Sequence, residues 1–90
     1  MIEIVLYTKP GCCLCDMVKT QLRKVRASQP FALREVNILQ DNEAYAQFHE
    51  EIPVVFINGR KAFTYHLDEG VLLQQLKSLA TEGEQPEHGS

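Results

Sequence analysis

The chain opens with a strand pattern that two turn-forming residues interrupt and a helix pattern follows. Residues 2–7, IEIVLY, are apolar and partly β-branched, which is typical of a strand. Pro10 and Gly11 break this run, and from about Cys13 apolar residues recur at helical spacing. The apolar stripe of this helix consists of Leu14, Val18, Leu22 and Val25, with Met17 beside it. A strand and a helix in this order favour a fold in which the next strand lies parallel to the first, after a right-handed crossover.

A second strand, a second helix and a third strand are predicted further along the chain. Residues 31–39 predict the second strand, since Leu33, Val36 and Ile38 supply its apolar positions. Asp41 is a suitable N-cap for the helix that follows, because its side-chain oxygen accepts a free backbone N–H. Residues 52–57, IPVVFI, form a continuous apolar run, which indicates a buried central strand.

A hairpin and a last helix complete the pattern. Asn58-Gly59 is a strong hairpin signal, and residues 60–65 form the returning strand. Asp68 can cap a last helix, whose apolar residues are Val71, Leu72, Leu76 and Leu79. The order β-α-β-α-β-β-α predicts an α/β fold with a four-stranded mixed sheet and helices on both of its faces.

Length, charge and hydropathy limit what the chain can be. Its 90 residues suit a single small domain over residues 1–80, followed by a disordered polar tail over residues 81–90. A net charge of −3 argues against nucleic acid or an anionic membrane as a partner. No apolar run approaches the ~20 residues of a membrane helix. The opening residues lack a signal-peptide pattern, so we expect a cytoplasmic protein whose thiols are kept reduced. We also expect the protein to be a monomer.

All three cysteines lie within four consecutive positions, at Cys12, Cys13 and Cys15. Residues three apart lie on neighbouring turns of one helix face, so the sulfurs of Cys12 and Cys15 can reach disulfide distance. The free N–H groups at a helix N-terminus stabilise a thiolate, and Lys9 can add a positive charge. We therefore expect Cys12 to be the exposed attacking thiol and Cys15 the less ionised resolving thiol.

Three other interpretations of the cysteines remain open. They can be small buried hydrophobic residues, as free cysteines often are. They can hold zinc or, across a dimer, an iron–sulfur cluster, although a closed site needs four ligands and His66 would have to supply one of them. The chain can also be a non-catalytic adaptor that holds a peptide at the strand edge beside Pro53.

Pro53 stands at the start of the third predicted strand, where a proline removes a hydrogen-bond donor from the sheet. We expect a cis Ile52–Pro53 peptide bond for this reason. The predicted strand order brings this position beside the end of the first strand, next to Cys12. An unpaired backbone N–H and C=O would then face the sulfurs and form a docking edge for an extended peptide or glutathione.

Two stretches of the sequence together resemble a known family. YTKPGCCLC, followed by IPVVFINGR, is similar to the glutaredoxins, which have the thioredoxin fold. The resemblance extends from Met1 to about Leu79. It is closest to the short glutaredoxin-like proteins that replace the central Pro-Tyr of the Cys-Pro-Tyr-Cys site.

This resemblance implies a thiol–disulfide oxidoreductase that takes part in electron transport and needs no dissociable cofactor. It implies that Cys12 is the nucleophile, Cys15 the resolving cysteine and Pro53 the cis-proline. Lys9 would contact a glutathione carboxylate, and Tyr7 would line the site unless it is an aromatic core residue at the strand end. Glutathione or a thioredoxin-like protein would return the oxidised protein to the dithiol form.

The chain departs from the glutaredoxin pattern in two places. Cys13-Leu14 replaces Pro-Tyr, which adds a third thiol that we expect to be exposed. After the hairpin, glutaredoxins place a glycine pair and an aspartate that hold glutathione, whereas this chain has the bulky Tyr65 and His66. Asp68 is the only candidate for that anchor, unless it is a plain helix N-cap. We therefore expect weak glutathione-linked activity and better reaction with a protein partner.

Overall fold

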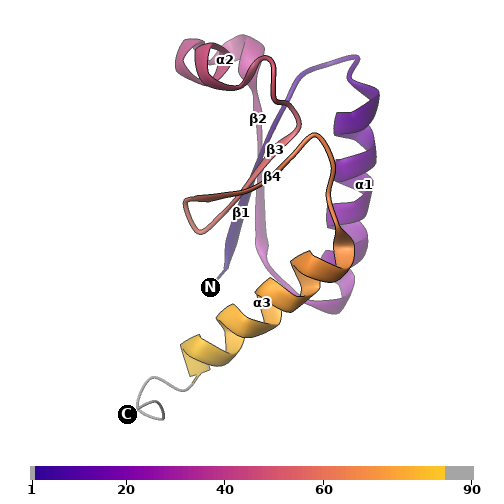
Figure 1. Ribbon diagram of the computed structural model, residues 1–90, viewed down its shortest axis with the longest axis vertical. Coiled ribbons are helices and arrows are strands. Elements are labelled where there is room, and N and C mark those ends of the chain that lie inside the picture. The colour runs from indigo at the N-terminus through magenta and orange to yellow at the C-terminus, as the bar shows by residue number, and fades with distance from the viewer. Residues whose placement is uncertain (1, 85–90) are drawn as a thin grey trace.

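The computed structural model describes residues 2–84 and confirms the predicted order of elements. In chain order these are β1 (Glu3–Thr8), α1 (Cys13–Ser28), β2 (Ala32–Asn37), the short 3-10 helix η1 (Ile38–Gln40), α2 (Asn42–Phe48), β3 (Val54–Ile57), β4 (Arg60–Thr64) and α3 (Glu69–Glu84) (Figure 1).

The last helix extends beyond the predicted end of the domain. α3 continues to Glu84, four residues past the limit at residue 80, because no proline interrupts the chain before Pro86. The prediction of a disordered tail falls, from residue 85 onward, outside the described residues. Within the described part of the chain, no helix combines the length and apolar character that crossing a membrane requires.

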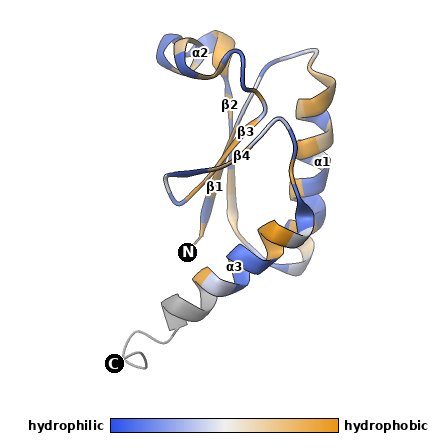
Figure 2. Ribbon diagram, in the orientation of Figure 1, coloured by the Kyte–Doolittle hydropathy of each residue, from blue (hydrophilic) through white to orange (hydrophobic). Residues whose placement is uncertain are grey.

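The four strands form one mixed sheet in the order β2-β1-β3-β4. β1 is parallel to β2 and antiparallel to β3, so that Tyr7 has Val36 on one side and Val54 on the other. β3 and β4 form the predicted hairpin, with positive φ angles of 50° at Asn58 and 84° at Gly59, as a type I′ turn requires. Figure 2 shows that the tip of this hairpin is hydrophilic.

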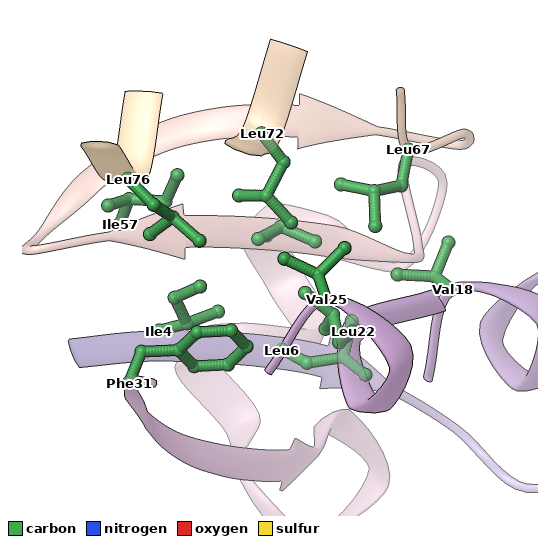
Figure 3. Packing of buried hydrophobic residues seen from close by; sticks show 11 residues of the cluster. Ile4, Leu6, Val18, Leu22, Val25, Phe31, Ile57, Leu67, Leu72 and Leu76 are labelled. Atoms are coloured by element: carbon green, nitrogen blue, oxygen red, sulfur yellow. The ribbon is translucent and has the colours of Figure 1, made fainter. Parts of the chain in front are cut away.

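The larger hydrophobic cluster lies between one face of the sheet and the helices α1 and α3. Alternate residues of β1, Ile4 and Leu6, point to this face and are fully buried. In Figure 3 the labelled side chains of α1 and α3 point toward the sheet. The helix residues of this cluster are Val18, Leu22, Val25, Leu72 and Leu76.

The buried stripe of α1 begins one residue later than predicted. Cys15 is fully buried, whereas Leu14 is only half-buried and Met17 is 57% exposed. Both starting points fit the helical period, and the position of the first turn, capped by Cys12, decides between them. The difference is confined to the first turn, and the burial of Cys15 agrees with the expectation that it is less exposed than Cys12.

The smaller cluster lies on the opposite face of the sheet, under α2. It contains Ile38, Ala44, Phe48 and Val54, and Tyr7 of β1 packs against it. Asp41 caps α2 as predicted, accepting the N–H groups of Glu43 at 3.0 Å and Ala44 at 3.1 Å. With α1 and α3 on one face and α2 on the other, the expected two-sided α/β arrangement is confirmed.

β2 ends two residues before the predicted limit at residue 39. The side-chain oxygen of Asn37 accepts the N–H of Leu39 at 2.9 Å, which caps η1 and turns the chain out of the sheet. Leu39 is consequently 56% exposed, while Ile38 is fully buried in the smaller cluster.

Candidate active site

Cys12 is the last residue of the loop between β1 and α1, and it is the N-cap of that helix. Gly11 precedes it with a φ of 80°, a conformation that glycine adopts without strain. The Sγ atom of Cys12 accepts the backbone N–H of Cys15 at 3.2 Å, and its carbonyl accepts the N–H of Asp16 at 3.1 Å. The sulfur therefore lies at the positive end of the α1 dipole, where a negative charge is stabilised.

The three thiols differ in exposure in the expected order. Cys12 is half-buried, Cys13 is exposed and Cys15 is fully buried. The prediction that Cys12 is the more exposed member of the Cys12/Cys15 pair is confirmed, as is the exposure of Cys13.

Burial raises the pKa of the Cys15 thiol, because a thiolate is poorly solvated in the core. A hydrogen bond with the Cys12 side chain raises this pKa further. Hydrogen bonds from the Thr8 side chain and the Lys9 backbone act in the opposite direction, because both stabilise the thiolate. The net effect is a raised pKa, which favours the neutral thiol of Cys15.

Lys9 contacts the site through its backbone. Its backbone N–H forms a hydrogen bond with the side chain of Cys15. Lys9 also lines a polar hollow of about 350 Å³ together with Thr8 and Asp16. The interaction of its ammonium group with Cys12 or with a substrate carboxylate stays a prediction.

The Ile52–Pro53 peptide bond is cis, as predicted, and Pro53 is fully buried. Ile52 packs in the same hydrophobic cluster as Cys15, with Cys12 at its margin. The expectation of an open docking edge is wrong for two of its groups. The N–H of Ile52 donates to the carbonyl of Phe48 at 3.1 Å, and the carbonyl of Pro53 accepts the N–H of Tyr65 at 2.9 Å. Both groups are therefore already hydrogen-bonded within the protein, one to the end of α2 and the other to the chain after β4.

Tyr7 belongs to an aromatic group beside the cysteines. Its ring lies 4.6 Å from the ring of Phe48 and 5.5 Å from that of Phe56, measured between centroids. The same cluster includes Cys12 and Cys15. Tyr7 therefore has the packing of a core aromatic and also lies in the cluster that supports the site.

Asp68 occupies the N-terminus of α3. Its Oδ1 atom accepts the N–H of Val71 at 3.1 Å, and its carbonyl accepts the N–H of Leu72 at 2.9 Å. These contacts are those of a helix N-cap. A role for Asp68 in anchoring glutathione stays a prediction.

Sequence reasoning missed one contact of Thr8 and the backbone conformation of Tyr65. Thr8 is the last residue of β1, and its side chain forms a hydrogen bond with the side chain of Cys15. The sequence pattern did not predict this contact. Tyr65 has a φ of 67° and bonds to the Pro53 carbonyl, and no local sequence signal predicts a positive φ for tyrosine.

The described residues, 2–84, contain no group of three or more His, Cys, Asp or Glu side chains arranged to hold a metal ion. Cys13 is exposed while Cys15 is buried, so two of the three sulfurs face different surroundings.

The fold and the site together define a thioredoxin-fold protein with a Cys-x-x-Cys pair at the N-terminus of its first helix. A model of the family described as "Glutaredoxin-like domain (DUF836)" matches residues 3–77, and the chain belongs to this family. Membership supports a redox-type function in general.

Individual relatives agree with this assignment. The "Glutaredoxin-like protein YDR286C homolog" of Dictyostelium discoideum is 26% identical over 84 residues, covering 87% of this chain and 78% of that protein. The solution structure of protein Ne2328 from Nitrosomonas europaea is 26% identical with a TM-score of 0.70, covering 79% of this chain and 86% of that one. A mutant thioredoxin from Halobacterium salinarum shares the fold, with a TM-score of 0.66 at 15% identity over 86% of this chain and 73% of that one.

Proposed function

We propose that this protein is a thiol–disulfide oxidoreductase that cycles between a Cys12/Cys15 dithiol and a Cys12–Cys15 disulfide. The observation that carries the proposal is the Cys12 sulfur at the N-terminus of α1, where it accepts the Cys15 N–H at 3.2 Å. This hydrogen bond becomes stronger when the sulfur is charged. The half-buried position of Cys12 leaves part of it accessible to a partner, while Cys15 is enclosed.

In the first step the Cys12 thiolate attacks one sulfur of a partner disulfide. A bond forms between Cys12 and that sulfur, and the disulfide bond of the partner breaks. The second partner sulfur leaves as a thiolate and takes a proton from water. The product is a mixed disulfide, and Cys15 remains a neutral thiol beneath it.

In the second step Cys15 loses its proton to water and attacks the sulfur of Cys12. The mixed disulfide breaks, and the remaining partner sulfur leaves as a thiolate that takes up a proton from water. The partner has then gained two electrons and two protons. The protein has lost these two electrons in forming the Cys12–Cys15 disulfide. Hydrogen bonds from the Thr8 side chain and the Lys9 backbone stabilise the Cys15 thiolate during this step.

A thiol reductant then returns the protein to its dithiol form, and we propose a protein dithiol of the thioredoxin type in preference to glutathione. The chain after β4 carries Tyr65, 46% exposed, where a glycine would leave its backbone open to a small thiol peptide. A protein dithiol does not depend on that close approach.

The test measures reduction of insulin disulfides in the presence of dithiothreitol. We expect the wild-type protein to accelerate the reaction and Cys12→Ser to abolish the acceleration. Cys13→Ser is the matched control, because this exposed neighbour has no role in either step, and it should retain the activity. Cys15→Ser should accumulate a mixed disulfide that mass spectrometry detects. An unchanged rate in Cys12→Ser would refute the proposal.

A further inference from the structure

Tyr65 has a backbone conformation that tyrosine rarely adopts. Its φ is 67°, and the N–H of His66 donates to the carbonyl of Thr64 at 2.7 Å, which closes a three-residue turn around it. Glycine would take this conformation without steric cost. A bulky residue held in a sparsely populated region is a reason to ask what its side chain does.

Both ends of Tyr65 are bonded to the segment that leads into β3. Its backbone N–H donates to the carbonyl of Pro53 at 2.9 Å. Its phenolic hydroxyl donates to the carbonyl of Glu50, also at 2.9 Å and fifteen residues away in sequence. Tyr65 therefore bonds to both ends of the segment 50–53, at Glu50 and at Pro53.

Two further contacts fix the same segment. Glu51 forms an ion pair with Lys61 of β4, and the N–H of Ile52 donates to the carbonyl of Phe48 at 3.1 Å. Ile52 in turn packs in the cluster that holds Cys15, with Cys12 at its margin. The shape of residues 50–53 thus determines the apolar surface beside the sulfurs.

We propose that Tyr65 is a positioning residue for the reaction with protein disulfides. Its hydroxyl and its backbone N–H hold residues 50–53 in the shape against which a partner chain lies when its disulfide meets Cys12. Because Tyr65 is 46% exposed, its ring also adds an aromatic face to that surface. This inference rests on the proposed function and names the residue that selects an extended protein substrate.

The experiment compares Tyr65→Phe, which loses only the hydroxyl, with Tyr65→Gly, which loses the ring and fits the positive φ. Tyr45→Phe is the matched control, because Tyr45 is also 46% exposed and its ring stacks on His49 instead. For each variant, KM and kcat are measured with insulin, together with the iodoacetamide alkylation rate of Cys12 and the urea midpoint of unfolding.

We expect Tyr65→Phe to raise KM by about threefold to tenfold, as the loss of one hydrogen bond implies, with kcat and the alkylation rate unchanged. Tyr65→Gly should raise KM at least as much, and Tyr45→Phe should not change it. An unchanged KM in Tyr65→Phe would overturn the inference, as would a KM that rises only in step with a lowered urea midpoint. A wild-type protein that does not reduce insulin would instead remove the proposed function, and the inference with it.

Discussion

At the scale of single residues, the site depends on an asymmetry between two sulfurs of one helical turn. Cys12 caps α1 and is half-buried, whereas Cys15 takes a core position that a valine or leucine could occupy. The cap stabilises negative charge at the first sulfur, and burial opposes it at the second. Under the proposed function, this difference in position would give attack to Cys12 and resolution to Cys15.

The raised pKa of Cys15 predicts how stability depends on pH in the reduced protein. The folded state holds the thiol proton more tightly than the unfolded chain, whose cysteines titrate near pH ~8.5. The full stability is present below that pH and decreases as the pH rises through the folded pKa, because the unfolded state loses its proton first. Urea midpoints between neutral and alkaline pH should fall for the wild type and fall less for Cys15→Ala. Cys13→Ser is the control that should retain the wild-type slope, and equal slopes in all three proteins would contradict the prediction.

Thr8 supplies a second prediction at this scale. Its side chain stabilises the Cys15 thiolate, so Thr8→Val should slow the second step by about threefold to tenfold. Quenched-flow mass spectrometry would show a longer-lived mixed disulfide. Thr20→Val, an exposed change on α1, should leave its lifetime unchanged. A lifetime that is the same in Thr8→Val and the wild type would show that the hydroxyl is not used.

At the scale of elements, the order of strands and helices could be predicted because apolar periodicity and turn residues mark it. The hairpin at Asn58 and the cap at Asp41 follow directly from local chemistry. The first buried position of α1 and the end of β2 could not be predicted, because each depends on one capping contact, at Cys12 and Asn37, that competes with an equally good periodic alternative.

The candidate site was predictable to a similar degree. The cysteine pair and the cis Ile52–Pro53 bond followed from residue types and strand order. The hydrogen bonds that occupy two backbone groups beside the expected docking edge did not, because they join Ile52 to Phe48 and Pro53 to Tyr65 through tertiary contacts. Local patterns carry no information on which distant carbonyl a free N–H will find.

Asp68 allows a prediction that separates an element-capping role from a ligand-binding role. Asp68→Ala should destabilise the protein by about 1 kcal/mol through loss of the α3 cap, whereas Asp68→Asn should preserve the cap. If Asp68 only caps the helix, Asp68→Asn should also leave the reaction with glutathione mixed disulfides unchanged. Urea unfolding and steady-state kinetics of both variants provide the measurement. A raised KM for the glutathione substrate in Asp68→Asn would instead identify the carboxylate as an anchor.

At the scale of the whole molecule, the cysteines lie in a different hydrophobic cluster from most of the core. The larger cluster joins α1 and α3 to the sheet through fully buried residues such as Leu22 and Leu72. The smaller cluster, under the single short helix α2, holds Cys15 and the residues around it. We therefore expect surface changes at the cysteine end of the molecule to leave the larger cluster intact.

The exposed residues after β4 lead to a prediction that compares glutathione with protein substrates. Tyr65 has the backbone conformation of a glycine and a half-exposed ring, and His66 beside it is exposed. We predict that their side chains block a close approach of glutathione to the backbone, and the loss of about two charge-assisted hydrogen bonds would then weaken its binding roughly a hundredfold. Reduction of a glutathione mixed disulfide should therefore be slow beside reduction of insulin. Replacing both residues, Tyr65→Gly with His66→Gly, should raise the glutathione rate while lowering the insulin rate, with Tyr45→Phe as the control. A wild-type preference for the glutathione substrate would show that these side chains do not obstruct it.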